Sequence, residues 1–324
     1  MATRYIRKTA ILAKSETTYG TDATPTEAAN ALLISNCSIT PLNAQNVSRD
    51  LIRPYLGASE QLLGTANVEL TFDVEFAGSG AAGTGAPYAA LLKACLLTET
   101  LTASIRAEYT LNSPSTTVYS ASIYYFVDDV KHIALGCMGT FDLKMGLGQR
   151  PVLSFRFVGI DGGATAASPS ALTLTAWKTP LAITDANTGD LTFGATYTAA
   201  TPTLTGGTGY PSQGLELSLG NDVQHVPLLG GEQVVVTGRE ITGKIALDLT
   251  AAQVVTFITA VKANTLQSLG IMHGTAAGYK TMLFMPSVQL INPTVADVNG
   301  KAMMGFDFRA LPSSGNDELK LVVH

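Results

Sequence analysis

The chain has 324 residues, of which 46% are hydrophobic and only 14% are charged, and its formal net charge is −5. The apolar content excludes a disordered chain, and the acidic balance excludes a protein that grips nucleic acid by neutralising phosphates. No apolar run approaches the roughly 18 residues of a membrane span, so we expect no membrane partner. The length is typical of two domains.

The segment 1–35 is polar and contains Gly20, Pro25 and several alanines. We therefore predict an N-terminal arm over residues 1–35. The apolar run at residues 10–13 is too short for the hydrophobic region of a signal peptide, so we do not expect a secreted protein.

Three cysteines, Cys37, Cys95 and Cys137, are widely separated and odd in number. This pattern favours reduced thiols, which are typical of a cytoplasm, over a disulfide framework. Because free cysteine usually behaves as a small core residue, we expect all three to be buried and structural.

A half-buried strand is predicted at residues 67–76, where five apolar residues alternate with polar ones. Three of the polar positions, Glu69, Asp73 and Glu75, are acidic. A helix is predicted at residues 87–97, because a proline stands in its first turn and four apolar or cysteine residues share one side.

A hairpin is predicted further along, where two alternating runs at residues 141–145 and 153–157 flank a turn at residues 146–151. Asp142 occupies a polar position in the first run. One face of this hairpin should therefore be dry, and the other should meet water.

The second half of the chain repeats the plan of the first. Strand, helix, strand, turn and strand recur in that order at residues 244–249, 251–263, 285–290, 298–301 and 304–309. Asp248 and Asp307 occupy polar alternate positions in two of these strands. We predict a tandem duplication, with a first domain at 36–162, a linker and loop excursion rich in Thr, Ala, Gly and Pro at 163–212, and a second domain at 213–324.

Two glycine motifs resemble nucleotide sites but lack the right context. The GxGxxG spacing from Gly78 to Gly83 follows a strand with an acidic face, whereas a dinucleotide-binding first strand is buried on both faces. The GxxxxGK spacing from Gly238 to Lys244 continues with Ile245 in place of the Ser or Thr that binds magnesium. We expect neither motif to bind a nucleotide.

The sequence contains no convincing catalytic or metal-binding constellation. The four histidines are scattered, and none has a second histidine or cysteine at metal-ligand spacing. The carboxylates alternate along strands, as they do on solvated faces, and no pair suggests acid and base chemistry. We therefore expect a non-enzymatic protein without cofactor or metal.

Several long stretches closely resemble the major tail tube proteins of siphophages, which are long-tailed bacteriophages. They lie at residues 8–35, 48–64, 67–96 and 215–249, and the similarity extends over nearly the whole chain. The resemblance implies a mainly β fold with two tandem β-sandwich domains, each with a flanking helix. The long hairpins of neighbouring subunits would then combine into a shared β-barrel ring around a channel.

The same resemblance implies function, partners and location. The protein would be a structural subunit of the tail tube, whose stacked rings conduct genomic DNA from capsid to host. Family rings are commonly sixfold, and the repeat within the chain favours a trimer with pseudo-sixfold symmetry, with a hexamer as the alternative. The tape measure, tail terminator and distal tail proteins would be further partners, and the tube would be assembled in the host bacterial cytoplasm and located in the virion tail.

The acidic strand positions are candidates for the channel wall, because a negative wall repels phosphates and lets DNA pass without specific binding. These channel-lining candidates are Glu69, Asp73, Glu75, Asp142, Asp248 and Asp307. The arm at residues 1–35 is predicted to dock on a neighbouring ring.

Two other classes of function stay open. A virion-surface or extracellular β-sandwich that binds a receptor or glycan would also show short alternating strands. Such a module should carry clustered exposed aromatic residues, whereas this chain has a single tryptophan, Trp177, and mostly dispersed tyrosines. An enzyme that uses the Gly78 to Gly83 loop is the third possibility.

Overall fold

The computed structural model describes residues 3–113 and 117–324. The first part of the chain is almost entirely strand. Its elements are β1 (Thr9–Ser15), β2 (Ala31–Leu32), β3 (Ile34–Ser48), β4 (Gln61–Glu75), α1 (Ala89–Ala94), β5 (Leu97–Thr102), β6 (Arg106–Leu111), β7 (Ala121–Val127), β8 (Val130–Gly146) and β9 (Val152–Ala166).

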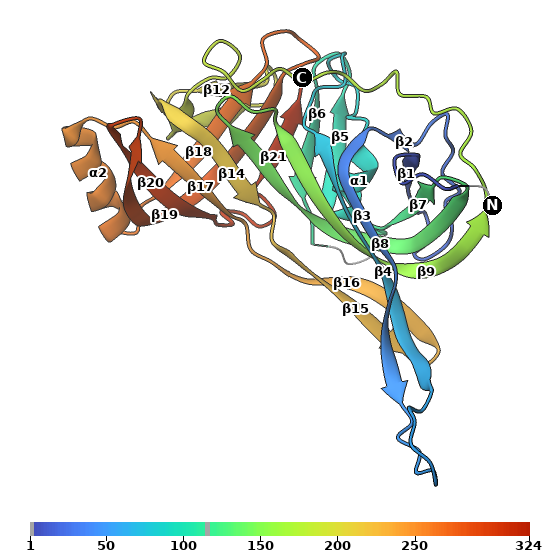
Figure 1. The fold of residues 1–324 in the computed structure, drawn as a ribbon. Helices are drawn as coiled ribbons and strands as arrows, with labels where there is room; N and C mark the ends of the chain where they lie inside the picture. The colour runs from blue at the N-terminus through green and yellow to red at the C-terminus, as the bar shows by residue number, and fades with distance from the viewer. Residues whose placement is uncertain (1–2, 114–116) are drawn as a thin grey trace.

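The remainder of the chain continues in the same manner (Figure 1). Its elements are β10 (Leu191–Phe193), β11 (Thr196–Thr198), β12 (Thr203–Thr205), β13 (Thr208–Tyr210), β14 (Ser212–Ser218), β15 (Asn221–Leu228), β16 (Gly231–Arg239), β17 (Thr242–Leu247), α2 (Ala251–Lys262), β18 (Leu266–His273), β19 (Thr281–Val298), β20 (Lys301–Ala310) and β21 (Lys320–Val323). The predicted fold class, mainly β with a sandwich architecture, is confirmed.

One layer of the sandwich is a continuous antiparallel sheet of eight strands. Their order is β3-β4-β9-β8-β14-β17-β20-β19. The first four strands and the last four follow the same plan, in which a long hairpin is joined to a second hairpin that comes later in the chain. We call this layer the eight-stranded sheet. Within one chain it is open and does not close into a barrel.

The second layer contains the shorter strands and both helices. β1 pairs with β2 and β7, while β5, β6, β21, β19, β18, β10 and β13 follow one another in a second run of pairings. β8 and β19 are long enough to belong to both layers. The first half of β8 pairs with β7 on one side and β9 on the other, and the first half of β19 pairs with β18 and β21. The last halves of both strands pair in the eight-stranded sheet.

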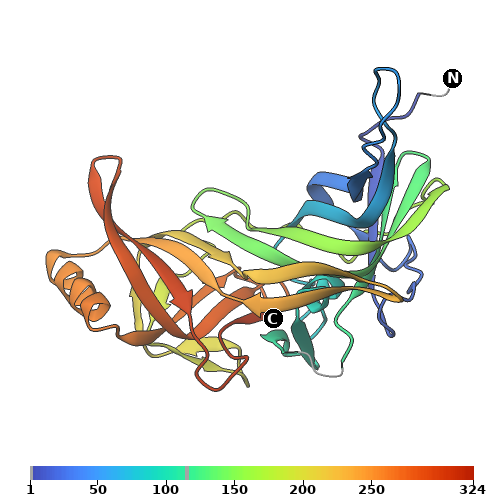
Figure 2. The ribbon, with the colours of Figure 1, turned by 90° about the horizontal axis from the view of Figure 1, so that it is seen from below.

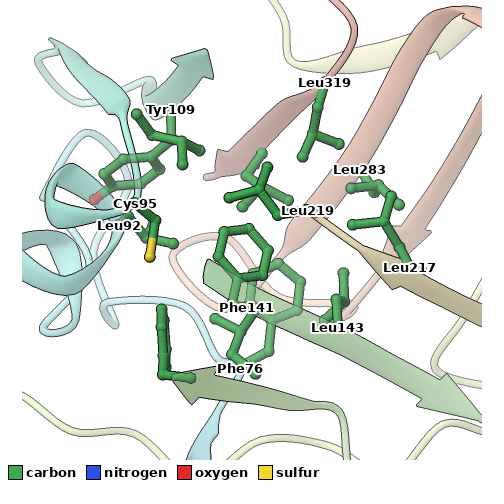
Figure 3. Close-up of a cluster of buried hydrophobic side chains, with 14 of the residues drawn as sticks. Phe76, Leu92, Cys95, Tyr109, Phe141, Leu143, Leu217, Leu219, Leu283 and Leu319 are labelled. Atoms are coloured by element: carbon green, nitrogen blue, oxygen red, sulfur yellow. The ribbon is translucent and has the colours of Figure 1, made fainter. Parts of the chain in front are cut away.

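A large hydrophobic core runs between the layers and through both halves of the chain, and a smaller cluster includes Leu12, Tyr124 and Phe126. In the eight-stranded sheet the alternate side chains that point inward are buried, as the strand period requires. Figure 3 shows Phe141 and Leu143 of the first half beside Leu217, Leu219 and Leu283 of the second.

Two strand pairings join the halves. β8 pairs with β14 in the eight-stranded sheet, and β21 lies between β6 and β19 in the second layer. Polar contacts strengthen the second junction, because the Glu108 carboxylate on β6 accepts hydrogen bonds from Lys320 on β21 at 3.2 Å and from Tyr197 on β11 at 3.1 Å. The halves are thus held in a fixed relation on both layers.

The segment predicted as an N-terminal arm lies within the fold over much of its length. β1 pairs with β7 along its whole length, and Ile11 and Leu12 are fully buried. The buried Glu16 carboxylate accepts hydrogen bonds from the Ser120 and Ser122 hydroxyls at 2.5 and 2.9 Å. A polar residue of this segment is thus buried with hydrogen-bond partners, so the polar composition of residues 1–35 did not indicate an exposed arm. Residues 1 and 2 of the predicted arm lie outside the described residues.

Both predicted helices are present. α1 is shorter than expected because Leu96 adopts a left-handed conformation with φ of 66°, which ends the helix. α2 begins with a capping box in which Thr250 and Gln253 bond each other's backbone N–H groups. Its buried residue Phe257 packs edge-on against Phe193. The predicted linker at 163–212 holds the end of β9 and the four short strands β10 to β13.

Candidate functional site

One face of the eight-stranded sheet packs on the core, and the other carries the polar alternate residues. We call the second the open face. A hollow of about 450 Å³ lies on it across β8, β14, β17, β20 and β19. The hollow extends from β8, where the two halves of the chain meet, over the four strands of the second half.

Charged residues of alternating sign cross the open face in a single row. Lys144 on β8 lies opposite Glu216 on β14, Glu216 opposite Lys244 on β17, and Lys244 opposite Asp307 on β20. The row continues past Lys144 to Val152 and Glu75. Opposite charges on neighbouring strands stabilise a sheet by roughly 0.2 to 1 kcal/mol per pair.

The lining of the hollow carries no net charge. Three carboxylates and three cations line it, namely Asp142, Glu216, Asp307, Lys144, Lys244 and Arg309. A surface of this kind has no excess of cations that could neutralise a run of phosphates.

The six acids predicted from the sequence occupy polar alternate positions, and several are paired with cations. Glu75 forms an ion pair with Arg150 at 2.8 Å, Glu69 lies 3.7 Å from Arg156, and Asp248 pairs with Lys301. Asp307 accepts a hydrogen bond from Asn292 at 2.9 Å, Asp73 accepts one from Asn36 at 2.7 Å, and Asp142 is exposed.

Sequence reasoning missed the cations and Glu216 as members of this surface. Lys144, Lys244 and Arg309 alternate with core residues in the same strands as the predicted acids, so the period-2 pattern contained the signal. Their cross-strand alternation depends on strand order and register, which the pattern along one strand does not contain.

A hairpin of β15 and β16 lies across the open face of the first half (Figure 2). A polar hollow of about 380 Å³ separates β15 from residues of β4, β8 and β9, including Glu69 and Arg156. Val158 belongs to the open face of β9 and is nevertheless only 5% exposed. Glu69 therefore lies at the edge of the region that the hairpin covers.

Asn221 anchors the base of this hairpin. Its side-chain amide donates to the backbone carbonyls of Gly139 at 3.0 Å and Cys95 at 2.9 Å, and its backbone N–H donates to Thr140 Oγ1 at 3.2 Å. Along β16, Val234 is 1% exposed, and its backbone bonds the Tyr19 hydroxyl.

The corresponding hairpin of β3 and β4 extends away from the rest of the chain (Figure 1). Its tip, residues 49–60, carries Ile52 and Leu56, each fully exposed. Glu60 forms ion pairs with Arg49 and Arg53, which brace the base of the tip. The end of this hairpin therefore presents apolar side chains to solvent.

The eight-stranded sheet has an unpaired edge at each end. Within the described residues, β3 pairs only with β4, and the segment 294–298 of β19 pairs only with β20. Such edges present backbone N–H and C=O groups to any strand that approaches.

Both nucleotide-like motifs lie in segments that have structural contacts. Near the first motif, the backbone N–H of Gly80 donates to the carbonyl of Gly278 at 2.8 Å. Lys244, the last residue of the second motif, belongs to the strand β17 and to the charge row. Within residues 3–113 and 117–324, no cluster of three His, Cys, Asp or Glu side chains could hold a metal.

The cysteines are placed largely as expected. Cys95 and Cys137 are buried, whereas Cys37 is half-buried. Burial raises the pKa of the Cys37 thiol to about 11 and that of the Cys95 thiol well above its usual value. The thiols therefore stay protonated at neutral pH and react slowly.

No helix among the described residues is long and apolar enough to cross a membrane. A family model with the description phage tail tube protein matches residues 6–310 of the chain. No curated protein matches the chain.

Proposed function

Since the chain belongs to the phage tail tube protein family, we propose that it is the ring-forming subunit of the tail tube and encloses a channel for genomic DNA. Membership of this family indicates a structural protein of the virion tail. The observation that carries the proposal is the open eight-stranded sheet with an unpaired edge at each end.

Closure of this sheet needs further copies of the chain. A closed barrel removes the exposed edges that otherwise lead to aggregation. A heterologous contact, in which one edge of a chain meets the other edge of the next, closes into a ring when the rotation between copies allows it. The two edges, β3 and β19, belong to opposite ends of the sheet, as this contact requires.

We favour a trimer, because each chain carries the four-strand plan twice. Three copies of eight strands, spaced about 4.8 Å apart and tilted by about 40°, give a wall roughly 150 Å around and 48 Å across. Six copies would double that diameter. The repeated strand order supports a tandem duplication over residues 36–162 and 213–324, so each chain would fill two of six equivalent positions.

The open face would line the channel. Outside the regions that the hairpins cover, its predicted acids would then contribute to the wall together with Lys144 and Lys244, so the wall would alternate in charge instead of being uniformly negative. Tight non-specific DNA binding requires cations that replace the counterions of the phosphates. A wall with balanced charge lets DNA pass without being held.

The proposed partners follow from the place of a tube in a tail. Further copies of this chain would form and stack the rings, and the tape measure, tail terminator and distal tail proteins would contact the tube. The protonated, largely buried thiols are compatible with assembly in the host bacterial cytoplasm. None of these roles needs a catalytic group.

Negative-stain electron microscopy of the purified protein tests the proposal. Rings or tubes of one uniform bore are expected, with three chains per ring by mass measurement of isolated rings. A protein that stays monomeric at high concentration, without rings or tubes, would contradict it and would favour a binding module of the virion surface.

A further inference from the structure

The two halves of the eight-stranded sheet can be aligned residue by residue through a shared pattern. β9 contains Phe155 and Phe157, and β20 contains Phe306 and Phe308, with the same single-residue spacing and inward direction. The residue after the second phenylalanine is Val158 in β9, which lies opposite Glu69. The equivalent Arg309 in β20 lies opposite Thr242.

This alignment makes β3 the equivalent of β14. Thr40 on β3 lies opposite Glu69, and Ser218 on β14 lies opposite Thr242, so Thr40 and Ser218 are equivalent. Each is followed three residues later by an asparagine, Asn43 or Asn221.

The same alignment makes the end of β19 the equivalent of the end of β8. Asp142 on β8 lies opposite Ser154, and Thr294 on β19 lies opposite Gly305. Ser154 and Gly305 each stand directly before the first phenylalanine of the pattern, so Asp142 and Thr294 are equivalent.

The junction inside the chain supplies a template for a junction between chains. Ser218 on β14 lies opposite Asp142 on β8, and Leu217 lies opposite Leu143, which is fully buried. The position equivalent to Leu143 is Val295, which is 73% exposed. Leu143 is buried because β14 of the second half pairs beside it. Among the described residues, Val295 has a paired strand, β20, on one side only.

We propose that β3 of one chain pairs with β19 of a second copy in the register of the internal junction, with Thr40 opposite Thr294. Ile39 then lies opposite Val295 of the second copy. The β3–β4 hairpin crosses the second copy's β20, as β15 and β16 cross β9 within the chain. The inference rests on the proposed ring and specifies how its subunits meet.

The exposed side chains of the hairpin agree with this docking. Leu42, Val47, Leu62 and Leu63 are between 48% and 62% exposed, which is unusual for four apolar residues of one hairpin. In the internal template the hairpin buries Val158 of the open face. The β3–β4 hairpin meets the equivalent Arg309 and the half-buried Ile291 of the second copy.

Disulfide trapping tests the register. Thr40→Cys and Thr294→Cys are combined in a Cys37→Ser background, since Cys37 is the one half-buried cysteine among the three. Directly opposite strand residues lie about 4.5 to 5.5 Å apart at Cα, within disulfide range, whereas residues two positions further along lie about 7 to 8 Å apart.

Assembled tubes of the matched pair should give covalent dimers and trimers on a non-reducing gel after mild oxidation. The control pair, Thr40→Cys with Ala296→Cys, should give at least about tenfold less. Tubes that form without this preference overturn the register and leave the proposed function intact. Wild-type protein that forms no rings or tubes instead overturns the proposed function.

A second variant covers the case in which the cysteine pair does not assemble. Val295→Glu should leave the monomer folded and abolish rings, because a carboxylate would be buried at the junction. The control Val255→Glu, at a residue 65% exposed on α2, should assemble normally. Normal rings from Val295→Glu would overturn the proposed register.

Discussion

Replacement of Glu108 by glutamine is expected to lower the free energy of unfolding by about 2 to 3 kcal/mol, because it leaves neighbouring cations without their counter-charge in a buried place. The side chain is 9% exposed. Its carboxylate pairs with Arg106 at 2.8 Å and with Lys320 at 3.2 Å, and the second contact joins the two halves of the chain. Glutamine keeps the size and one acceptor oxygen but removes the charge.

The pH dependence of this effect has a definite sign. Burial raises the pKa of Glu108, but the hydrogen bond from Arg106 and the charge of Lys320 outweigh it, so the pKa lies below its ordinary value. A depressed pKa gives stabilisation that is fully present above the ordinary carboxyl value of about 4.3 and is lost as the pH falls through the folded-state value. The difference between wild type and Glu108→Gln should therefore be full at pH 7 and should shrink below about pH 4.

Guanidinium denaturation of unassembled chains measures the effect, with circular dichroism and the fluorescence of the single tryptophan, Trp177, as probes. Glu60→Gln is the control. Its carboxylate pairs with Arg49 and Arg53 but is 54% exposed, so the cost should stay under about 1 kcal/mol. Two results would refute the assignment of Glu108 as a buried connection between the halves. One is an equal loss of unfolding free energy in Glu108→Gln and Glu60→Gln. The other is a difference between wild type and Glu108→Gln that grows as the pH falls.

Two further predictions concern the core and the open face. Phe72→Ala should cost about 3 to 5 kcal/mol in the same denaturation assay, because Phe72 is 1% exposed and stacks on Phe157, whereas Leu62→Ala at a 53% exposed position should cost under about 1 kcal/mol. Glu216→Lys should raise the retention of duplex DNA by assembled tubes and make it strongly salt-dependent, since it places a cation between Lys144 and Lys244. Glu216→Gln should have a smaller effect, and identical retention by all three proteins would contradict the assignment of the open face to the channel.

The strands of the eight-stranded sheet could be predicted because each buries one face only. In β4, Phe72 is buried and Asp73 is not, and in β20 the same relation holds for Phe306 and Asp307. A period of two residues is a property of the single strand, so it is visible without knowledge of any neighbour. The helix α2 was predicted from its place in the repeated order of elements, where it follows a strand as α1 does.

The neighbours of each strand could not be predicted in this way. The contacts of β14 with β8, and of β21 with β6, join residues more than 60 positions apart, and nothing in the alternation of either strand names its partner. Polarity was also an unreliable guide at the N-terminus, where Glu16 is 5% exposed because hydroxyl and amide donors surround it. The charge row on the open face depends on both strand order and register, and so it emerged only from the fold.

Strand order also changes the electrostatic argument for a channel. Along any one strand the open-face positions could be mostly acidic, as in β4 with Glu69, Asp73 and Glu75. Across the strands the sign alternates, and neighbouring strands are only about 4.8 Å apart. Opposite charges at this spacing cancel within a distance shorter than the Debye length of about 8 to 10 Å at physiological salt. In the proposed ring, a DNA phosphate near the hollow would therefore meet neither a strong attraction nor a strong repulsion, and smooth passage would depend on balanced charge instead of a negative wall.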